Sequence, residues 1–441
     1  VGSEPVKRVA SWEGWGWKPI AAFLIMGINP SWALPSALFV EVPIFQLSSP
    51  EGLSLAAWMN AAINLGLILT LSYVAYDMVI GNIHPESAIK GIICISSVFC
   101  FLTAFTWQFT ALNMSISILT MSIIGGMVGS FQVLVFLPYL TRYKPALFAT
   151  VRLGDVIFVG VLSLLGILQQ ATSLSPTIFF LIFAPTQILP LFALEYITRR
   201  KLGLNTDSSY RPLRATRGNE HTPLVRNETN ELQKYPKKSL DAPVSENLRR
   251  LSDNSPSDTK SQRNGGFSKE SWKDIKKCWG VILCVCFINM HMWGSFISLL
   301  PLACRNASPS VDPEGSNTLA FCNNFGLLSL VPGIILAPMF KCQEYVYYLL
   351  SIFQVALYVL IYAAIFDRPY GMWGSYTSAS VLTLSFCLAR FNEAFIATSV
   401  YTYFGDRFPH RSYQIASFMG ICDRLATTVM TWGSFFWVIL R

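Results

Sequence analysis

The chain has 441 residues, of which 52% are hydrophobic and only 13% are charged, and its mean hydropathy is +0.44. A soluble domain carries about a quarter charged residues, so this composition excludes a soluble globular protein and predicts a helical protein that crosses a membrane many times. The formal net charge of +8 is then typical of loops that face anionic lipid and does not indicate a nucleic-acid partner.

Apolar segments long enough to span a bilayer follow one another along the chain. They cover 19–42, 53–77, 89–110, 115–138, 146–168, 176–198, 278–302, 319–340, 344–366, 374–404 and 412–440. The sequence therefore predicts an all-α polytopic membrane protein with eleven transmembrane helices in a 6+5 arrangement. Its expected parts are an N-terminal stretch at 1–18, helices 1 to 6 at 19–198, a loop at 199–277, and helices 7 to 11 at 278–441.

The polar run at 199–277 separates the two groups of helices. It is rich in Ser, Asn, Pro, Lys and Arg and holds few apolar side chains, so we expect it to be disordered. If the run is cytoplasmic, 27 Lys and Arg lie on its side of the membrane and 3 on the other. Positive loops face the cytoplasm, so the N-terminus is predicted to be cytoplasmic and the C-terminus extracellular.

The loop at 303–318 is expected to lie outside. It contains Asn306-Ala307-Ser308, an acceptor pattern for N-glycosylation. Cys304 and Cys322 flank this loop and would face an oxidising compartment. They are either joined in a disulfide or are two unpaired thiols at helix ends.

The sequence shows no Gly-rich phosphate loop, no nucleophile elbow and no His/Glu metal cluster. We therefore expect no enzyme, no cofactor and no metal. Ionisable side chains at membrane depth are costly in hydrocarbon, and they mark a pathway or a binding site. They fall into three sets: Arg152 with Asp155, Arg390 with Glu393, and Asp423 with Arg424. The first two sets have the spacing of an intrahelical pair, whereas the adjacent third pair must find partners on other helices. All three are either structural ion pairs or gates of a substrate path.

The first apolar segment holds Pro30 and Pro35 within six residues. Proline inside a spanning helix frees carbonyls and kinks the axis, and only protein or a water-filled cavity satisfies those groups. Glu41 follows near the predicted outer end, with no basic residue close to it in sequence. In the second segment Asn60 and Asn64 share one helix face, which favours hydrogen bonds to other helices.

Two stretches resemble a known family of carriers. SWALPSALFVEVPIFQLSSPEG (31–52) resembles the first external loop region of the riboflavin transporter family, solute carrier family 52. VFLPYLTRYKPALFATVRLGDVIFVGVLSLLGILQQ (135–170) resembles that family's junction between segments four and five. The chain departs from the family at Asp155, where the family has Glu, and at Ser36-Ala37, where it has Asn-Gly. The overall plan of helices is equally similar to that of equilibrative nucleoside transporters.

The resemblance implies a plasma-membrane carrier for riboflavin or a closely related flat heterocycle, working by alternating access in a lipid bilayer. It also implies a fold related to the major facilitator class, whose helices one, four, seven and ten line a central cavity. The substrate-binding candidates are Ser31, Trp32, Ser36, Phe39 and Glu41 from the matched stretch, together with Asn289. Their hydroxyl and amide groups would hydrogen-bond the ring edge or ribityl hydroxyls, their rings would stack, and Glu41 would act near the outer mouth. The alternatives are an equilibrative nucleoside-type transporter and a membrane receptor that transports nothing.

Overall fold

The computed structural model describes residues 16–28, 30–80, 85–140, 143, 145–200, 269–307, 312, 315–340, 342–366, 375–408 and 411–440. Every named element in these ranges is a helix. Nine helices in the described part are long and apolar enough to cross a membrane, and they correspond to nine of the predicted segments. The all-helical membrane fold is thus confirmed, while the count of eleven helices stays a prediction.

The bounds of the elements before the polar run are α1 Trp17–Met26, α2 Pro30–Ser48, α3 Leu55–Ile80, α4 Pro85–Thr106, α5 Ile116–Phe131, η2 Gln132–Phe136, α6 Leu137–Leu140, α7 Pro145–Thr172, α8 Pro176–Phe183, η3 Ala184–Ile188 and α9 Leu189–Arg200, with a short 3-10 turn η1 at Gly52–Ser54. Those after it are α11 Lys269–Lys277, α12 Trp279–Asn289, η5 Met290–Phe296, α13 Ile297–Ala307, α14 Ser316–Leu336, η6 Ala337–Met339, α15 Glu344–Phe366, α16 Ser375–Arg407 and α17 Ser412–Leu440. The segments η2 and η5 are π-helical.

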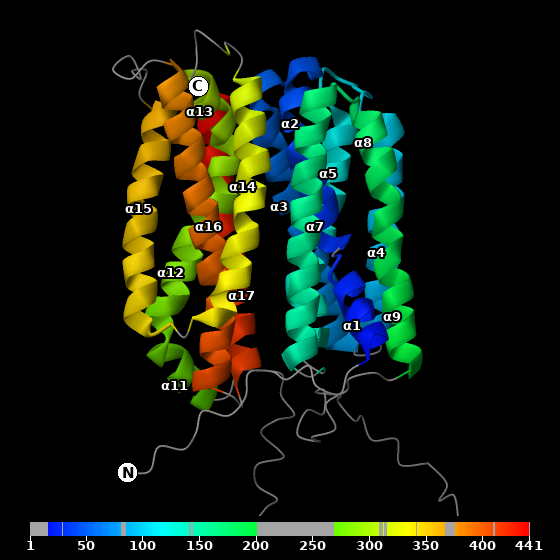
Figure 1. The fold of residues 1–441 in the computed structure, drawn as a ribbon, viewed down its shortest axis with the longest axis vertical. Helices are drawn as coiled ribbons and strands as arrows, with labels where there is room; N and C mark the ends of the chain where they lie inside the picture. The colour runs from blue at the N-terminus through cyan, green and yellow to red at the C-terminus, as the bar shows by residue number, and fades with distance from the viewer. Residues whose placement is uncertain are drawn as a thin grey trace, which may run out of the picture.

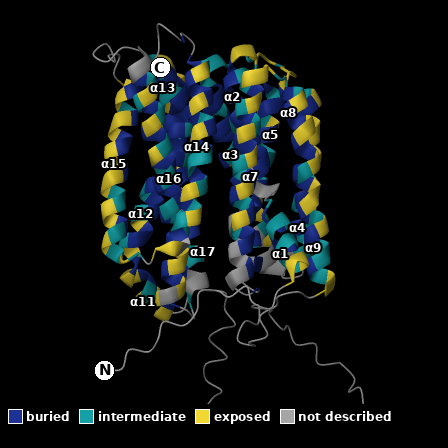
Figure 2. Ribbon diagram, in the orientation of Figure 1, coloured by how far each residue is buried: buried dark blue, intermediate teal, exposed yellow. Residues whose placement is uncertain are grey.

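The helices form two bundles that stand side by side, one built from α1 to α9 and the other from α11 to α17 (Figure 1). Contacts between the bundles run mainly along α7 and α14, α2 and α14, and α3 with α13 and α17. The buried side chains gather between helices, whereas the outward faces carry exposed apolar residues (Figure 2). Such a surface suits lipid, because hydrocarbon rather than water must surround the spanning helices.

The first predicted helix is broken rather than kinked. α1 ends at Met26, and α2 begins at Pro30, which suits the first turn of a helix because that position needs no N–H partner. The break follows Gly27, where an added Cβ would lie only 2.0 Å from the backbone oxygen of Val151 and 2.9 Å from the Cα of Gly154 in α7. α2 then continues through Pro35 without ending.

The predicted end of this helix at residue 42 is wrong, because α2 continues to Ser48. Glu41 therefore lies inside the helix and is fully buried, not exposed near an outer mouth. The polar run also differs in extent from the prediction. Its last nine residues, Lys269–Lys277, form the helix α11, while 201–268 lie outside the described residues.

The two ends of the bundle hold different features. α1 begins, α9 ends and α11 lies at one end, whereas the C-terminal end of α17 lies at the opposite end (Figure 1). Which end faces the cytoplasm stays a prediction from the Lys and Arg distribution.

Candidate functional site

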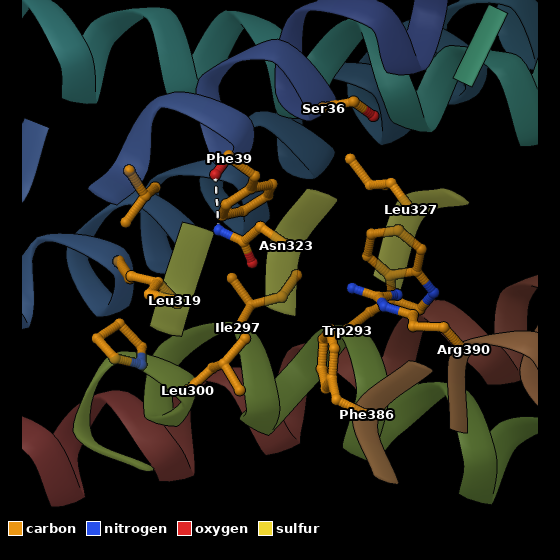
Figure 3. Close-up of a pocket in the computed structure, with 13 residues that line it drawn as sticks. Ser36, Phe39, Trp293, Ile297, Leu300, Leu319, Asn323, Leu327, Phe386 and Arg390 are labelled. Carbon is orange, nitrogen blue, oxygen red and sulfur yellow. Dashed lines mark hydrogen bonds between the residues drawn. The ribbon is translucent and has the colours of Figure 1, made fainter. Parts of the chain in front are cut away.

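A pocket lies between the two bundles, where α2 meets η5, α13, α14 and α16. The space between its walls is about 520 Å³, a figure that includes the open space at its mouth. Most of its wall is aliphatic. The aromatic and polar side chains in the wall are Phe39, Trp293, Phe386, Ser36, Asn323 and Arg390 (Figure 3).

Arg390 is the charged group in the wall of this pocket. Its guanidinium carbon lies 4.3 Å from the ring centre of Trp293 and 5.2 Å from that of Phe386 (Figure 3). Its Nη1 donates to Glu393 Oε2 at 3.2 Å, and the Nε1 of Trp293 donates to Glu393 Oε1 at 2.6 Å. The Nε of Arg390 is buried and has no hydrogen-bond partner among the described residues. The pocket thus offers a fixed cation beside two aromatic rings, with donors beyond the one that Glu393 engages.

The π-helical segment η5 places Trp293 in the pocket wall. A π turn leaves carbonyl oxygens without their usual helical partners, and such turns are frequent at functional sites. Here the side-chain amide of Asn60, from α3 of the other bundle, donates to the carbonyl oxygens of Trp293 at 3.2 Å and Gly294 at 2.9 Å. Since Asn60 is itself buried, this contact ties the pocket wall to the opposite bundle.

A second backbone contact crosses the pocket. Pro43 lacks an N–H, so the carbonyl of Phe39, four residues earlier in α2, has no helical donor. The Nδ2 of Asn323 in α14 donates to this oxygen at 2.9 Å, as the dashed line in Figure 3 marks. The sequence argument for freed carbonyls concerned Pro30 and Pro35, so neither Pro43 nor its partner Asn323 was predicted to make this contact.

The predicted binding residues divide into three groups. Ser36 and Phe39 line the pocket. Ser31 and Trp32 belong to α2, but their side chains lie outside the described residues. Glu41 does not line the pocket, and neither does Asn289, which lies beside Asp423 of α17.

Glu41 has unusual surroundings for a carboxylate. Its side chain is fully buried, and neither of its oxygens has a well-formed hydrogen bond among the described residues. The amide of Gln169 in α7 lies beside it and is also buried without a well-formed bond. A buried carboxylate without a cation is costly when charged, so this position favours the neutral acid.

The charged sets occupy two different regions. Arg390 and Glu393 belong to the pocket wall, as described above. Arg152 and Asp155 form the expected intrahelical pair, with Nη1 and Oδ2 2.7 Å apart. Tyr401 of α16 lies within electrostatic range of Arg152 and of both members of the third set, Asp423 and Arg424 in α17. Charges of α7 therefore approach charges of the other bundle away from the pocket.

A network of amides and hydroxyls joins the bundles elsewhere. Asn64 Nδ2 donates to Thr431 Oγ1 at 3.1 Å, and Thr428 Oγ1 donates to Asn64 Oδ1 at 2.9 Å. Asn60 also donates to Ser298 Oγ at 3.1 Å. The two asparagines thus make the interhelical hydrogen bonds that their spacing predicts.

The predicted external loop is flanked by thiols that the structure brings together. The sulfurs of Cys304 and Cys322 lie 3.9 Å apart as free thiols, so the disulfide stays a prediction. Asn306, the glycosylation candidate, donates its Nδ2 to the carbonyls of Ala364 at 3.1 Å and Ile365 at 3.3 Å. A glycan on this nitrogen would require those contacts to break.

Comparison with known proteins supports the resemblance found in the sequence. Residues 20–178 match the family described as solute carrier family 52, riboflavin transporter. Solute carrier family 52, riboflavin transporter, member 3-B, from Danio rerio is 27% identical over 139 residues, which are 30% of this chain and 30% of that protein. The match spans less than a third of the relative's length. The predicted resemblance to the riboflavin transporter family is confirmed by these two matches.

Solved structures show the fold class. A D-xylose-proton symporter is similar with a TM-score of 0.55 at 12% identity, covering 94% of this chain and 89% of that one. A nucleoside transporter has a TM-score of 0.47 at 12% identity, covering 95% of this chain and 89% of that one. The first likeness shows that the fold is similar to that of this symporter. The matched family and this solved structure are both carriers, and the described part of the chain has nine helices long and apolar enough to cross a membrane.

Proposed function

We propose that this chain, which matches the riboflavin transporter family over residues 20–178, is a membrane transporter that carries riboflavin or a closely related flat heterocycle. The observation that carries the proposal is Arg390, held in the pocket between two aromatic rings with its Nε unused. A flat ring that bears carbonyl oxygens stacks on aromatic side chains and accepts hydrogen bonds from a guanidinium.

The pocket residues take separate roles in this proposal. Arg390 donates to a ring carbonyl oxygen, and Trp293 and Phe39 pack against the faces of the ring. Ser36 and Asn323 lie on the opposite wall and bind the hydroxyls of the sugar-alcohol chain. Asn323 would exchange its bond to the Phe39 carbonyl for a substrate hydroxyl, which links substrate binding to the contact between α2 and α14.

Transport follows from rocking of 19–198 against 278–441 around this pocket. The asparagine network joins α3 to α17 across the interface. The charged sets of α7 and α17 approach each other away from the pocket, and in this proposal they act as a gate. Arg390 and Glu393 act in the binding site rather than as a gate.

The proposed topology has eleven crossings, a cytoplasmic N-terminus and an extracellular C-terminus, in the plasma membrane. It is supported by the Lys and Arg distribution and by the opposite positions of α1's start and α17's end (Figure 1). Single cysteines placed at Ser173 and at Arg199, in a background without native cysteines, test it. In intact cells an impermeant thiol reagent should label S173C and spare R199C, and the reverse pattern would contradict the topology.

Uptake by purified protein in proteoliposomes tests the substrate. We expect saturable uptake of radiolabelled riboflavin that unlabelled riboflavin blocks and uridine blocks poorly. Saturable uridine uptake that riboflavin competes poorly would instead favour the nucleoside-type alternative. Absence of uptake for both, with folded protein, would favour a receptor.

A further inference from the structure

The short helix α11 has three distinct faces, although it has only nine residues. Ser271, Ile275 and Cys278 are buried against the bundle. A second face carries Glu270, Asp274 and Lys277. The third face carries Trp272 and Lys276 and is exposed, and the exposed Trp279 at the start of α12 follows next in this series. This division follows from the side-chain positions at i, i+4 and i+7 of a helix.

The second face fixes the rotation of α11 about its axis. Arg411, just before α17, donates Nη1 to Asp274 Oδ2 at 2.7 Å and Nη2 to Glu270 Oε2. Lys277 donates to Asp274 Oδ1 at 3.0 Å. The acidic residues of the helix are therefore occupied within the protein, and they do not neutralise the lysines of the third face.

The third face combines aromatic rings with uncompensated positive charge. Trp272 and Trp279 are each 42% exposed, and both pack against Phe418, with ring centres 5.2 and 5.9 Å from its ring centre. Lys276 lies between them along the helix, and Lys273 is adjacent and exposed. Neither lysine has an ion-pair partner among the described residues.

The third face lies at the expected boundary of the membrane. The spanning helix that follows begins at Trp279, directly after α11. α11 lies at the end of the bundle where α1 begins and α9 ends (Figure 1). Tryptophan is enriched at membrane boundaries, and lysine there reaches the phosphates of the headgroups.

We propose that the face formed by Trp272, Lys273, Lys276 and Trp279 is a binding surface for anionic phospholipid headgroups. The indoles lie at the level where acyl chains meet headgroups, and the two ammonium groups bind the lipid phosphates and carboxylates. Arg411 ties α11 to α17 through Asp274 and Glu270. Lipid bound to the other face of α11 therefore stabilises this end of the second bundle. The inference does not depend on the substrate.

Hydrogen exchange of residues 269–277 in the full-length protein, reconstituted in nanodiscs, tests the surface. The nanodiscs contain phosphatidylcholine with increasing phosphatidylserine. We expect phosphatidylserine to slow exchange in this peptide, and Lys276→Gln to require about fivefold more phosphatidylserine for the same protection. Added salt should reduce the effect, because headgroup attraction is screened.

The matched control is Arg199→Gln, at the end of α9 on the same side of the bundle. It removes one positive charge from an exposed side chain outside the proposed face and should leave the phosphatidylserine response unchanged. An equal loss of response in this control would show a general effect of net charge and would overturn the site.

Two further outcomes would also overturn the proposal. Full protection from inorganic phosphate added to phosphatidylcholine nanodiscs would mean that the site binds phosphate without a membrane. Full protection in phosphatidylcholine alone would mean that another part of the chain already covers the face.

Discussion

Arg390 has only part of its hydrogen-bonding capacity used within the protein. Glu393 accepts from Nη1 and Trp293 lies against the guanidinium plane, while Nε has no partner among the described residues. A guanidinium held by a carboxylate and a ring keeps its orientation when a substrate arrives, so little side-chain entropy is lost on binding. This arrangement suits recognition of a carbonyl oxygen at a fixed place.

The first prediction concerns Arg390→Lys. Lysine keeps the charge but cannot reproduce the planar fork and the stacking, so the riboflavin dissociation constant should rise about 10- to 100-fold. Quenching of riboflavin fluorescence on titration with purified protein measures this. Arg305→Lys, at an exposed position outside the pocket, is the control and should bind like the wild type. Unchanged affinity in Arg390→Lys would remove this residue from the binding site.

The second prediction concerns Glu41→Gln. The buried carboxylate has no cation beside it, so a neutral amide of equal size should leave the melting temperature in detergent unchanged or higher. Glu393→Gln should lower it, because the amide leaves Arg390 without its buried counter-charge. A fall in melting temperature for Glu41→Gln as large as that for Glu393→Gln would mean that Glu41 is charged and paired in the native protein.

The sequence predicts which ionisable side chains pair within a helix better than it predicts which side chains line the pocket. The spacing of Arg152 with Asp155 and of Arg390 with Glu393 is enough to predict each ion pair, because one helix turn brings them together. It does not reveal which helix face meets the pocket. Asn289 and Glu41 were therefore expected in the site, whereas Asn323 was not recognised.

Helices in this protein approach most closely where glycines meet. Gly27, at the end of α1, and Gly154 in α7 have Cα atoms so close that a Cβ on either would lie 2.9 Å from the other's Cα. Small residues allow such approach between membrane helices, where packing and hydrogen bonds supply the attraction. The break between α1 and α2 lies at this contact.

The third prediction is that Gly27→Ala destabilises the protein. The added methyl group would lie 2.0 Å from the backbone oxygen of Val151, so α1 and α7 must separate. The expected cost is roughly 1–3 kcal/mol, visible as a lower melting temperature in detergent. Gly91→Ala in α4 is the control, because no atom lies within 4 Å of its new Cβ, and it should be neutral or stabilising. Equal melting temperatures for both variants would contradict the close packing.

The fourth prediction concerns pH and α11. Hydrogen bonds from Lys277 and then Arg411 hold the pKa of Asp274 below its usual range, so these contacts stabilise the fold above the ordinary aspartate pKa. Their contribution is lost only as the pH falls through the lowered pKa. Asp274→Asn should therefore melt slightly below the wild type at neutral pH, by at most about 1 kcal/mol for such exposed pairs. The difference should vanish in strong acid. A difference that persists there would show that the loss is not electrostatic.

At the level of elements, the length of the apolar segments predicts the helices, whereas the prolines inside α2 do not predict where that helix ends. In the part of the chain that the structure describes, nine helices long and apolar enough to span match the apolar segments, because a bilayer demands continuous backbone bonding. Pro35 and Pro43 do not end α2, and Asn323 of α14 supplies a donor to the carbonyl that Pro43 frees. The π-helical η5 has no sequence signal, because it depends on the amide that Asn60 provides from another helix.

The whole molecule is two bundles that enclose a pocket at their interface. The division after the sixth predicted segment follows from the polar run, so the sequence alone predicts which helices belong together. The relative placement of the bundles does not follow from composition, because it depends on pairs such as Asn60 with Gly294 that lie 234 positions apart. The contacts of α3 with η5, α13 and α17 are neutral amides and hydroxyls, whereas α7 brings charges near those of α17.

The central claim is that the bundles rock around the pocket to carry riboflavin. A reversible lock between them tests this most directly, using Asn64→Cys with Thr431→Cys, since Asn64 Nδ2 and Thr431 Oγ1 lie 3.1 Å apart, in a background without native cysteines. Riboflavin uptake into proteoliposomes is measured after oxidation and again after reduction, with each single cysteine variant as the control. We predict that oxidation abolishes uptake in the double variant alone and that reduction restores it. Full riboflavin uptake by the cross-linked protein would contradict the account.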